Sequence, residues 1–107
     1  MSLTQLESFV AVAEEGRLGR AARRLHVSQP PLTRRIQRLE DELGVRLFDR
    51  TARGMALRPA GEVLLSHARV ILAAVGRARD SLHALARDGE DRDRSVGEGT
   101  EAAPDDP

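Results

Sequence analysis

Near the start of the chain, apolar residues recur every three or four positions in three successive segments. This spacing places them on one face of a helix, so we expect helices over residues 3–15, 18–25 and 29–43. Ser2 and Gln5 form a capping box sequence at the first helix, and a glycine follows both the first and the third. The apolar positions are Leu3, Leu6, Phe9, Val10 and Ala13, then Ala21, Ala22 and Leu25, and then Leu32, Ile36, Leu39 and Leu43.

The third expected helix begins with a serine, a glutamine and two prolines. Proline suits the first helical turn, because the N–H that it lacks would have no partner there. We expect Ser28 to cap this helix by accepting a backbone N–H with its hydroxyl. A short helix, a tight turn and a second helix with a polar exposed face are typical of a helix-turn-helix that reads a DNA groove. The polar positions on that face are Thr33, Arg34, Gln37 and Arg38.

Two short segments after the third helix predict a β-hairpin, or wing. Residues 45–50 and 55–58 are the expected strands, and residues 51–54 form the turn because they include a glycine. Arg53 stands at the tip of this turn. Arginines on exposed arms often enter the minor groove of DNA, and we expect this role for Arg53.

From Pro59 onward, one apolar residue recurs at alternating spacings of four and three over three heptads. This pattern predicts a long helix over residues 59–87 that packs along another helix. The chain offers no second long helix, so we expect a homodimer; the alternative is that the stripe folds back over its own domain. The stripe consists of Leu64, Ala68, Ile71, Val75, Ala78, Leu82 and Leu85.

The net charge of zero hides a strong asymmetry along the chain. Residues 1–87 contain 15 arginines and nine acidic residues, whereas residues 88–107 contain two arginines and eight acidic residues. From Arg17 to Arg58 there are 11 arginines and four acids, which is the electrostatic footprint of a phosphate-binding surface. A solvated arginine-rich face would have the same composition. Residues 88–107 have one large apolar side chain, so we expect a disordered acidic tail.

The composition argues against several other classes of protein. The chain has no cysteine, so disulfides and thiolate metal sites are excluded. Its longest apolar run is far too short to span a bilayer, and its start does not resemble a signal peptide, so we expect a cytoplasmic protein without a membrane partner. The three histidines lack metal-ligand spacing, and no catalytic motif is present. We expect no enzyme activity, no metal and no cofactor.

Many of these residues together resemble the N-terminal domain of LysR-type transcriptional regulators. The resemblance covers residues 1–87 and includes the helix-turn-helix, the wing and the linker in order. Its motifs are Ala21-Ala22, Leu25-His-Val-Ser-Gln-Pro-Pro-Leu-Thr-Arg34, Ile36, Leu39-Glu40, Glu42-Leu-Gly-Val-Arg-Leu-Phe48, Arg50-Thr51 and Pro59-Ala-Gly61.

The resemblance implies a winged helix-turn-helix whose third helix enters the major groove, and a dimer with antiparallel linker helices. It also implies base and phosphate contacts from the start of the third helix and from the wing, at Gln29, Pro30, Thr33, Arg34 and Arg53. The chemistry of these residues agrees, because glutamine pairs with adenine, arginine pairs with guanine, and the Thr33 methyl suits a thymine methyl. Gln37 and Arg38 lie further along the same face, and Ser28 is a further candidate for a phosphate contact.

The chain departs from the family pattern at three places. Arg17 and Gly19 replace small polar residues at the start of the second helix, which predicts a looser phosphate contact there. Arg58 replaces a frequent threonine before Pro59, so the linker helix is expected to lose its usual cap. The C-terminal inducer-binding domain of the family is expected to be absent, and no inducer site is evident.

Taken together, the sequence predicts a mainly α protein, with three helices and a short β-hairpin wing followed by a long dimerising linker helix. We expect a winged helix-turn-helix domain over residues 1–58, a linker helix over residues 59–87 and a tail over residues 88–107. The predicted function is sequence-specific binding to a palindromic double-stranded operator as a dimeric regulator. The alternative is an interaction protein whose linker helix pairs with a full-length regulator and modulates it.

Overall fold

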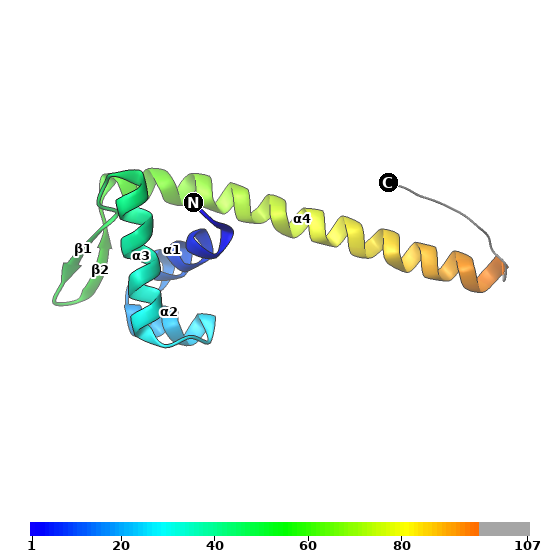
Figure 1. Ribbon diagram of the computed structural model, residues 1–107, viewed down its shortest axis with the longest axis horizontal. Coiled ribbons are helices and arrows are strands. Elements are labelled where there is room, and N and C mark those ends of the chain that lie inside the picture. Colours follow the sequence, from blue (N-terminus) through cyan, green and yellow to red (C-terminus); the bar gives the residue numbers. More distant parts are fainter. Residues whose placement is uncertain (97–107) are drawn as a thin grey trace. The chain divides into compact units, whose positions relative to one another are not determined.

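The computed structural model describes the backbone of residues 1–96 and the side chains of residues 1–89. Three helices come first, and all three have the expected bounds (Figure 1). A two-stranded antiparallel sheet and a long helix follow, which confirms the predicted mainly helical fold. The elements are α1 (Leu3–Glu15), α2 (Leu18–Leu25), α3 (Gln29–Leu43), β1 (Phe48–Thr51), β2 (Gly54–Leu57) and α4 (Pro59–Val96).

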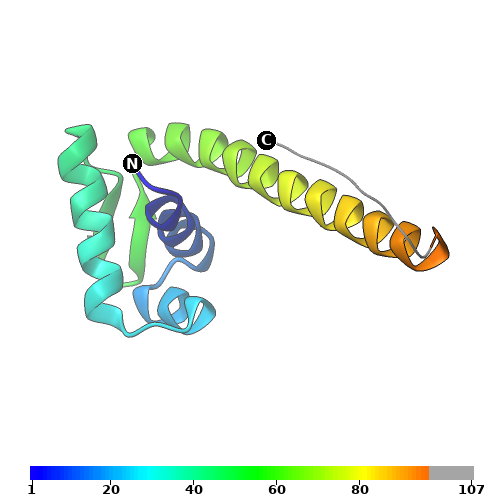
Figure 2. The same ribbon diagram turned by 45° about the vertical axis from the view of Figure 1, so that its right-hand side comes forward.

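The first compact unit of the chain comprises residues 1–73, and a second unit begins at Ala74. In the first unit a short loop joins α2 to the start of α3, as both ribbon views show (Figures 1 and 2). The Phe9 and Phe48 rings lie 5.4 Å apart at the centre of its core, and both side chains are fully buried. Leu32 and Leu39 of α3 pack into the same core. The helix-turn-helix therefore stands on one hydrophobic core that the hairpin shares.

The hairpin exists, but its strands are shifted from the expected ones. Phe48 pairs with Leu57 and Thr51 pairs with Gly54, so only Ala52 and Arg53 form the loop. Residues 45–47 lie outside the strand. The Leu47 N–H is bonded at 2.8 Å to a carboxylate oxygen of Glu40 at the end of α3, so it is not available to a strand partner.

The apolar stripe of α4 begins by packing inside its own chain. Ala68 is fully buried in the core, and Leu64 packs against that core. Further along the helix, Leu82 is 65% exposed and Leu85 is 64% exposed. The start of the stripe therefore folds back on its own domain, as the alternative predicted.

The end of α4 differs from the expected end at residue 87. The helix continues to Val96, so residues 88–96, which we expected to belong to the tail, are helical. The rest of the expected tail, residues 97–107, lies outside the described residues. In residues 1–96 no helix has an apolar stretch long enough to cross a membrane.

Ion pairs join three helices within the first unit. Arg24 Nη1 of α2 lies 2.9 Å from Glu14 Oε1 of α1, and Arg69 Nη2 of α4 lies 3.0 Å from Glu14 Oε2. The hydrogen bond from Arg24 lowers the pKa of Glu14, and the same bond raises the pKa of Arg24. Partial burial of Glu14 opposes this change without reversing it. These contacts hold α2 and α4 against α1.

Candidate nucleic-acid interface

The start of α3 is built without the expected cap. Ser28 occupies the N-cap position with extended backbone, but its side chain makes no capping hydrogen bond. An N-cap hydroxyl normally accepts from the N–H of the second or third helical residue. Those residues are Pro30 and Pro31, which have no N–H. The capping prediction is therefore wrong, and the hydroxyl is left exposed at the end of the helix.

The face of α3 opposite the core carries the predicted contact residues. Leu32, Ile36 and Leu39 are buried, which turns the polar positions outward. Thr33 is half-buried, and the remaining predicted residues of this face are exposed: Gln29, Pro30, Arg34, Gln37 and Arg38.

A surface hollow brings four of these residues together. It has a volume of about 410 Å³ and is called here the α3 hollow. Its lining comprises Gln29, Pro30, Thr33 and Arg34 together with Leu18 and Arg50. Gln37 lines a neighbouring hollow, whereas Ser28 and Arg38 line neither of the two. Arg53 is exposed in the two-residue loop of the hairpin, away from both hollows.

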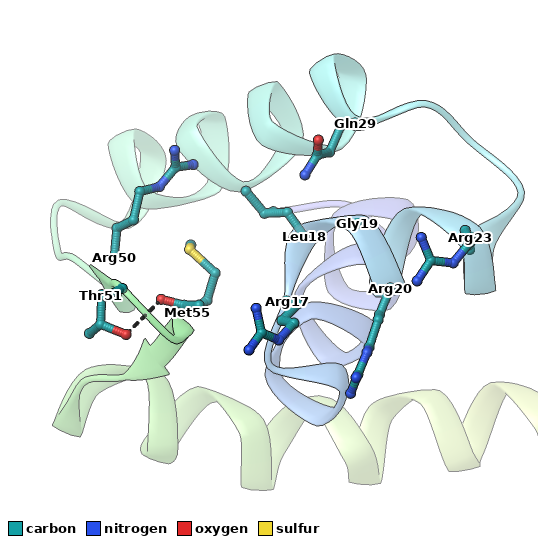
Figure 3. A pocket seen from close by; sticks show the side chains of 11 residues that line it. Arg17, Leu18, Gly19, Arg20, Arg23, Gln29, Arg50, Thr51 and Met55 are labelled. Atoms are coloured by element: carbon teal, nitrogen blue, oxygen red, sulfur yellow. Dashed lines mark hydrogen bonds between the residues drawn. The ribbon is translucent and has the colours of Figure 1, made fainter.

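The structure adds arginines that are not among the predicted DNA-contact residues. A third hollow of about 430 Å³, called here the arginine hollow, lies between α2 and the hairpin (Figure 3). Four arginines and Gln29 are among its lining residues. Two of these arginines stand out in the sequence, because Arg17 departs from the family pattern and Arg50 belongs to a family motif. The four arginines are Arg17, Arg20, Arg23 and Arg50.

The hairpin is fixed to the helices at its tip end. The Met55 N–H donates to the Gly16 carbonyl at 2.9 Å, which joins β2 to the α1–α2 connection. Gly54 has φ of 129°, and a Cβ there would lie 2.2 Å from the same carbonyl oxygen. The Thr51 hydroxyl donates to the Gly54 carbonyl at 3.0 Å and accepts from the Arg53 N–H at 3.2 Å. This network positions the loop that presents Arg53.

The arginines of the first unit divide into two groups. Arg24, Arg46, Arg58 and Arg69 form ion pairs with carboxylates. A second group has no salt bridge to a carboxylate of residues 1–89 and consists of Arg17, Arg20, Arg23, Arg34, Arg35, Arg38, Arg50 and Arg53. Six of these eight arginines line the α3 hollow or the arginine hollow or lie at the wing tip, so positive charge is left uncompensated where DNA is expected. Such a surface attracts phosphate oxygens.

Comparison with known proteins identifies the family to which this chain belongs. The sequence pattern described as "Bacterial regulatory helix-turn-helix protein, lysR family" matches residues 3–62. The HTH-type transcriptional regulator TfdT of Cupriavidus pinatubonensis is 55% identical over 87 residues, which are 81% of this chain and 38% of TfdT. The chain thus spans well under half the length of this relative.

Two solved structures of DNA complexes match the described fold. The crystal structure of the CbnR_DBD–DNA complex has a TM-score of 0.74 and 51% identity, covering 80% of this chain and 99% of that one. The crystal structure of the BenM_DBD/benA site 1 DNA complex has a TM-score of 0.76 and 38% identity, covering 80% and 97%. The matching family consists of transcriptional regulators, which confirms the prediction that the chain is not an enzyme. The chain belongs to the LysR family of bacterial transcriptional regulators and contains their DNA-binding helix-turn-helix domain.

Proposed function

We propose that this chain binds a specific double-stranded DNA sequence as a dimer and thereby regulates transcription in the bacterial cytoplasm. The observation that carries the proposal is the exposed start of α3, where Gln29, Thr33 and Arg34 line one hollow beside arginines that no carboxylate of residues 1–89 neutralises. The CbnR and BenM domains, which this fold matches, are solved in complex with DNA.

In this proposal α3 enters the major groove and reads base edges with its first two turns. Arg34 donates to guanine O6 and N7, and the Gln29 amide pairs with adenine. The Pro30 ring and the Thr33 methyl contact thymine methyl groups. Arg38 and Ser28 reach phosphates at the edges of this contact, and Gln37 extends base reading by one turn. Arg53 enters the adjacent minor groove from the hairpin.

The proposed dimer uses the apolar stripe of α4 beyond the part that packs on its own domain. Leu82 and Leu85 are about two-thirds exposed, and Ile71 is 37% exposed. Val75 and Ala78 complete this part of the stripe. Burial of such side chains against a second copy stabilises a helix pair. A dimer matches a palindromic operator, because its two-fold symmetry repeats α3 at two half-sites.

The proposal is tested by selecting duplexes from a random pool with the purified chain. We expect enrichment of an inverted repeat. Arg34→Ala should then lose the preference for the enriched duplex over a scrambled one, at a cost of about 1–3 kcal/mol. Arg87→Ala, on an exposed part of α4, is the matched control and should keep the preference. Unchanged discrimination by Arg34→Ala would refute the role of this residue, and failure to enrich any sequence would refute specific binding.

The alternative function, pairing of α4 with a longer relative, rests on the same exposed leucines. The two functions are distinguished by co-expressing this chain with a full-length LysR regulator from the same bacterium and identifying the dimers that form. Mixed dimers in preference to homodimers would favour the modulator. Homodimers that bind the selected duplex would favour the regulator.

A further inference from the structure

The carboxylate of Glu14 joins the first part of α4 to α1 and α2. Arg69 of α4 donates to Glu14 Oε2 through Nε at 3.2 Å and through Nη2 at 3.0 Å. Arg24 of α2 approaches the other oxygen, with 2.9 Å between Nη1 and Oε1. Among the described side chains, those of residues 1–89, Arg69 is the only one of α4 that hydrogen-bonds to α1, α2 or α3.

The place of Glu14 along α1 is unfavourable for the helix itself. Glu14 and Glu15 stand in the last turn of α1, which has no basic residue. Carboxylates at this end of a helix face its partial negative charge, whereas arginines there are favourable, as Arg24 is in the last turn of α2. The Glu14 carboxylate therefore contributes through its contacts with α2 and α4 and not through the stability of α1.

The other contacts of α4 with the core are apolar. Leu64, Leu65 and Leu72 pack against the core around the buried Ala68. Apolar burial has no directional preference, whereas a guanidinium that donates two N–H groups to a carboxylate holds a defined geometry. The side chains of Arg69 and Glu14 are 56% and 31% exposed, so their ion pair adds little to the stability of the fold. Its main contribution is geometric.

A small change in the direction of α4 has a large effect further along the helix. At about 1.5 Å per residue, the distance along α4 from Arg69 to Leu82 is about 20 Å. A tilt of about 10° displaces a point at that distance by about 3.5 Å, close to the rise of about 3.4 Å per base pair of DNA. In a dimer joined through α4, such a tilt shifts one α3 relative to the other by about one base pair.

We propose that the Glu14–Arg69 ion pair fixes the direction of α4 and thereby selects the spacing between the two half-sites that the dimer binds. The inference rests on the proposed function, because two half-sites require a dimer joined through α4. In a symmetric dimer, the distance between the two α3 helices depends on how each α4 is held against its own α1. The base contacts of α3 specify the sequence of each half-site, and the positioning residues Glu14 and Arg69 specify how far apart the half-sites lie.

The test measures binding to duplexes that share two selected half-sites and differ in spacing by single base pairs. Arg69→Ala breaks the ion pair, and Arg79→Ala, which removes the same charge from an exposed position of α4, is the matched control. Glu14→Gln weakens the pair from the side of α1 and leaves Arg24 paired with Glu15. A duplex with one half-site measures the base contacts alone. Circular dichroism melting establishes that each variant is folded.

In Arg69→Ala, the preference for the best spacing over spacings one base pair longer or shorter is expected to fall by about three- to tenfold, because each copy loses one partly exposed ion pair. The preference for the single half-site over a scrambled one should be unchanged. Glu14→Gln should show the same loss, and the double variant should lose no more than either single variant, because both substitutions remove one interaction. Arg69→Lys keeps the charge and should retain most of the preference, and Arg79→Ala should retain all of it.

A distance measurement tests the same ion pair without DNA. The chain has no cysteine, so Asp41→Cys with Ala73→Cys places one spin label on α3 and one on α4, both at exposed positions of the first unit. With labelled chains diluted in unlabelled protein, pulsed electron paramagnetic resonance measures the distance between the two labels of one chain. Arg69→Ala should broaden the distance distribution, whereas Arg79→Ala should leave it unchanged.

An unchanged spacing preference or an unchanged distance distribution in Arg69→Ala would overturn the inference. An equal loss of spacing preference in Arg79→Ala would also overturn it, because the effect would then come from net charge. Failure of the proposed function is distinguishable. In that case the wild-type chain selects no sequence, and the label distances alone decide whether the ion pair holds α4.

Discussion

Gly61 lies where the first turn of α4 crosses the segment that leads into β1. A Cβ at this position would lie 2.3 Å from the Leu47 carbonyl oxygen and 2.6 Å from Leu57 Cδ2. The same carbonyl accepts the Arg58 N–H at 2.9 Å, so it has little freedom to move. The close approach of α4 to the hairpin therefore depends on the absence of one side chain.

Replacing Gly61 by alanine should lower the free energy of unfolding by about 1–3 kcal/mol, because the backbone must shift to relieve the overlap. Urea denaturation measures this change. Gly76→Ala is the matched control on the same helix, because a Cβ there meets nothing within 4 Å. That substitution should raise the stability by up to about 1 kcal/mol through helix propensity. A loss of similar size in both variants would contradict the close-approach argument.

At the scale of elements, Glu40 joins the end of α3 to the start of the hairpin. Its Oε2 accepts the Leu47 N–H at 2.8 Å and the Phe48 N–H at 3.4 Å, and Arg46 Nε lies 3.8 Å away. Leu47 and Phe48 are buried, so these N–H groups have no access to water as an alternative partner. These contacts hold the end of α3 against the start of the hairpin.

Glu40→Ala should destabilise the first unit by about 1–3 kcal/mol, because two buried N–H groups lose their acceptor. Hydrogen exchange should speed up at the amides of β1 and β2 more than at those of α1. Glu40→Gln keeps an acceptor oxygen and should show a smaller effect. Asp41→Ala, at an exposed position of the same helix, serves as the control. Equal acceleration of exchange in α1 would argue against a local role in positioning the wing.

At the scale of the whole molecule, the stripe of α4 differs in burial along its length. Its start packs on the core through Leu64 and Ala68, whereas Leu82 and Leu85 are largely exposed. Long apolar side chains spaced three apart on a helix are normally covered by another element. This exposure supports the proposed pairing of two copies through the later part of α4.

Leu82→Glu combined with Leu85→Glu should convert the dimer to a monomer in sedimentation equilibrium, because each buried leucine contributes about 1.5–3 kcal/mol. Val63→Glu with Val70→Glu is the control, since both valines are more than half exposed on α4 and lie outside the stripe. The control should remain dimeric. If the control variant became a monomer while the leucine variant stayed dimeric, the dimer interface would lie on the other face of α4.

The sequence by itself determined the features that depend on neighbours along the chain. The bounds of α1, α2 and α3 follow from apolar periodicity and from their flanking residues. The loss of the Ser28 cap was also readable, because the two prolines after Gln29 have no N–H to donate. The first strand begins later than expected because Glu40, seven residues before Leu47, takes the N–H that a strand would use. That competition is invisible to a pattern of alternating residues.

Only the tertiary structure decided which distant residues share a surface. Arg17 and Arg50 come from different elements, and a single sequence offers no signal that their side chains line one hollow. It also placed the start of the α4 stripe in the core of the first unit, which a periodic pattern alone leaves undecided. The physical reason is the same in both cases. Periodicity specifies which residues share one face of a helix. The packing of whole elements decides what that face contacts.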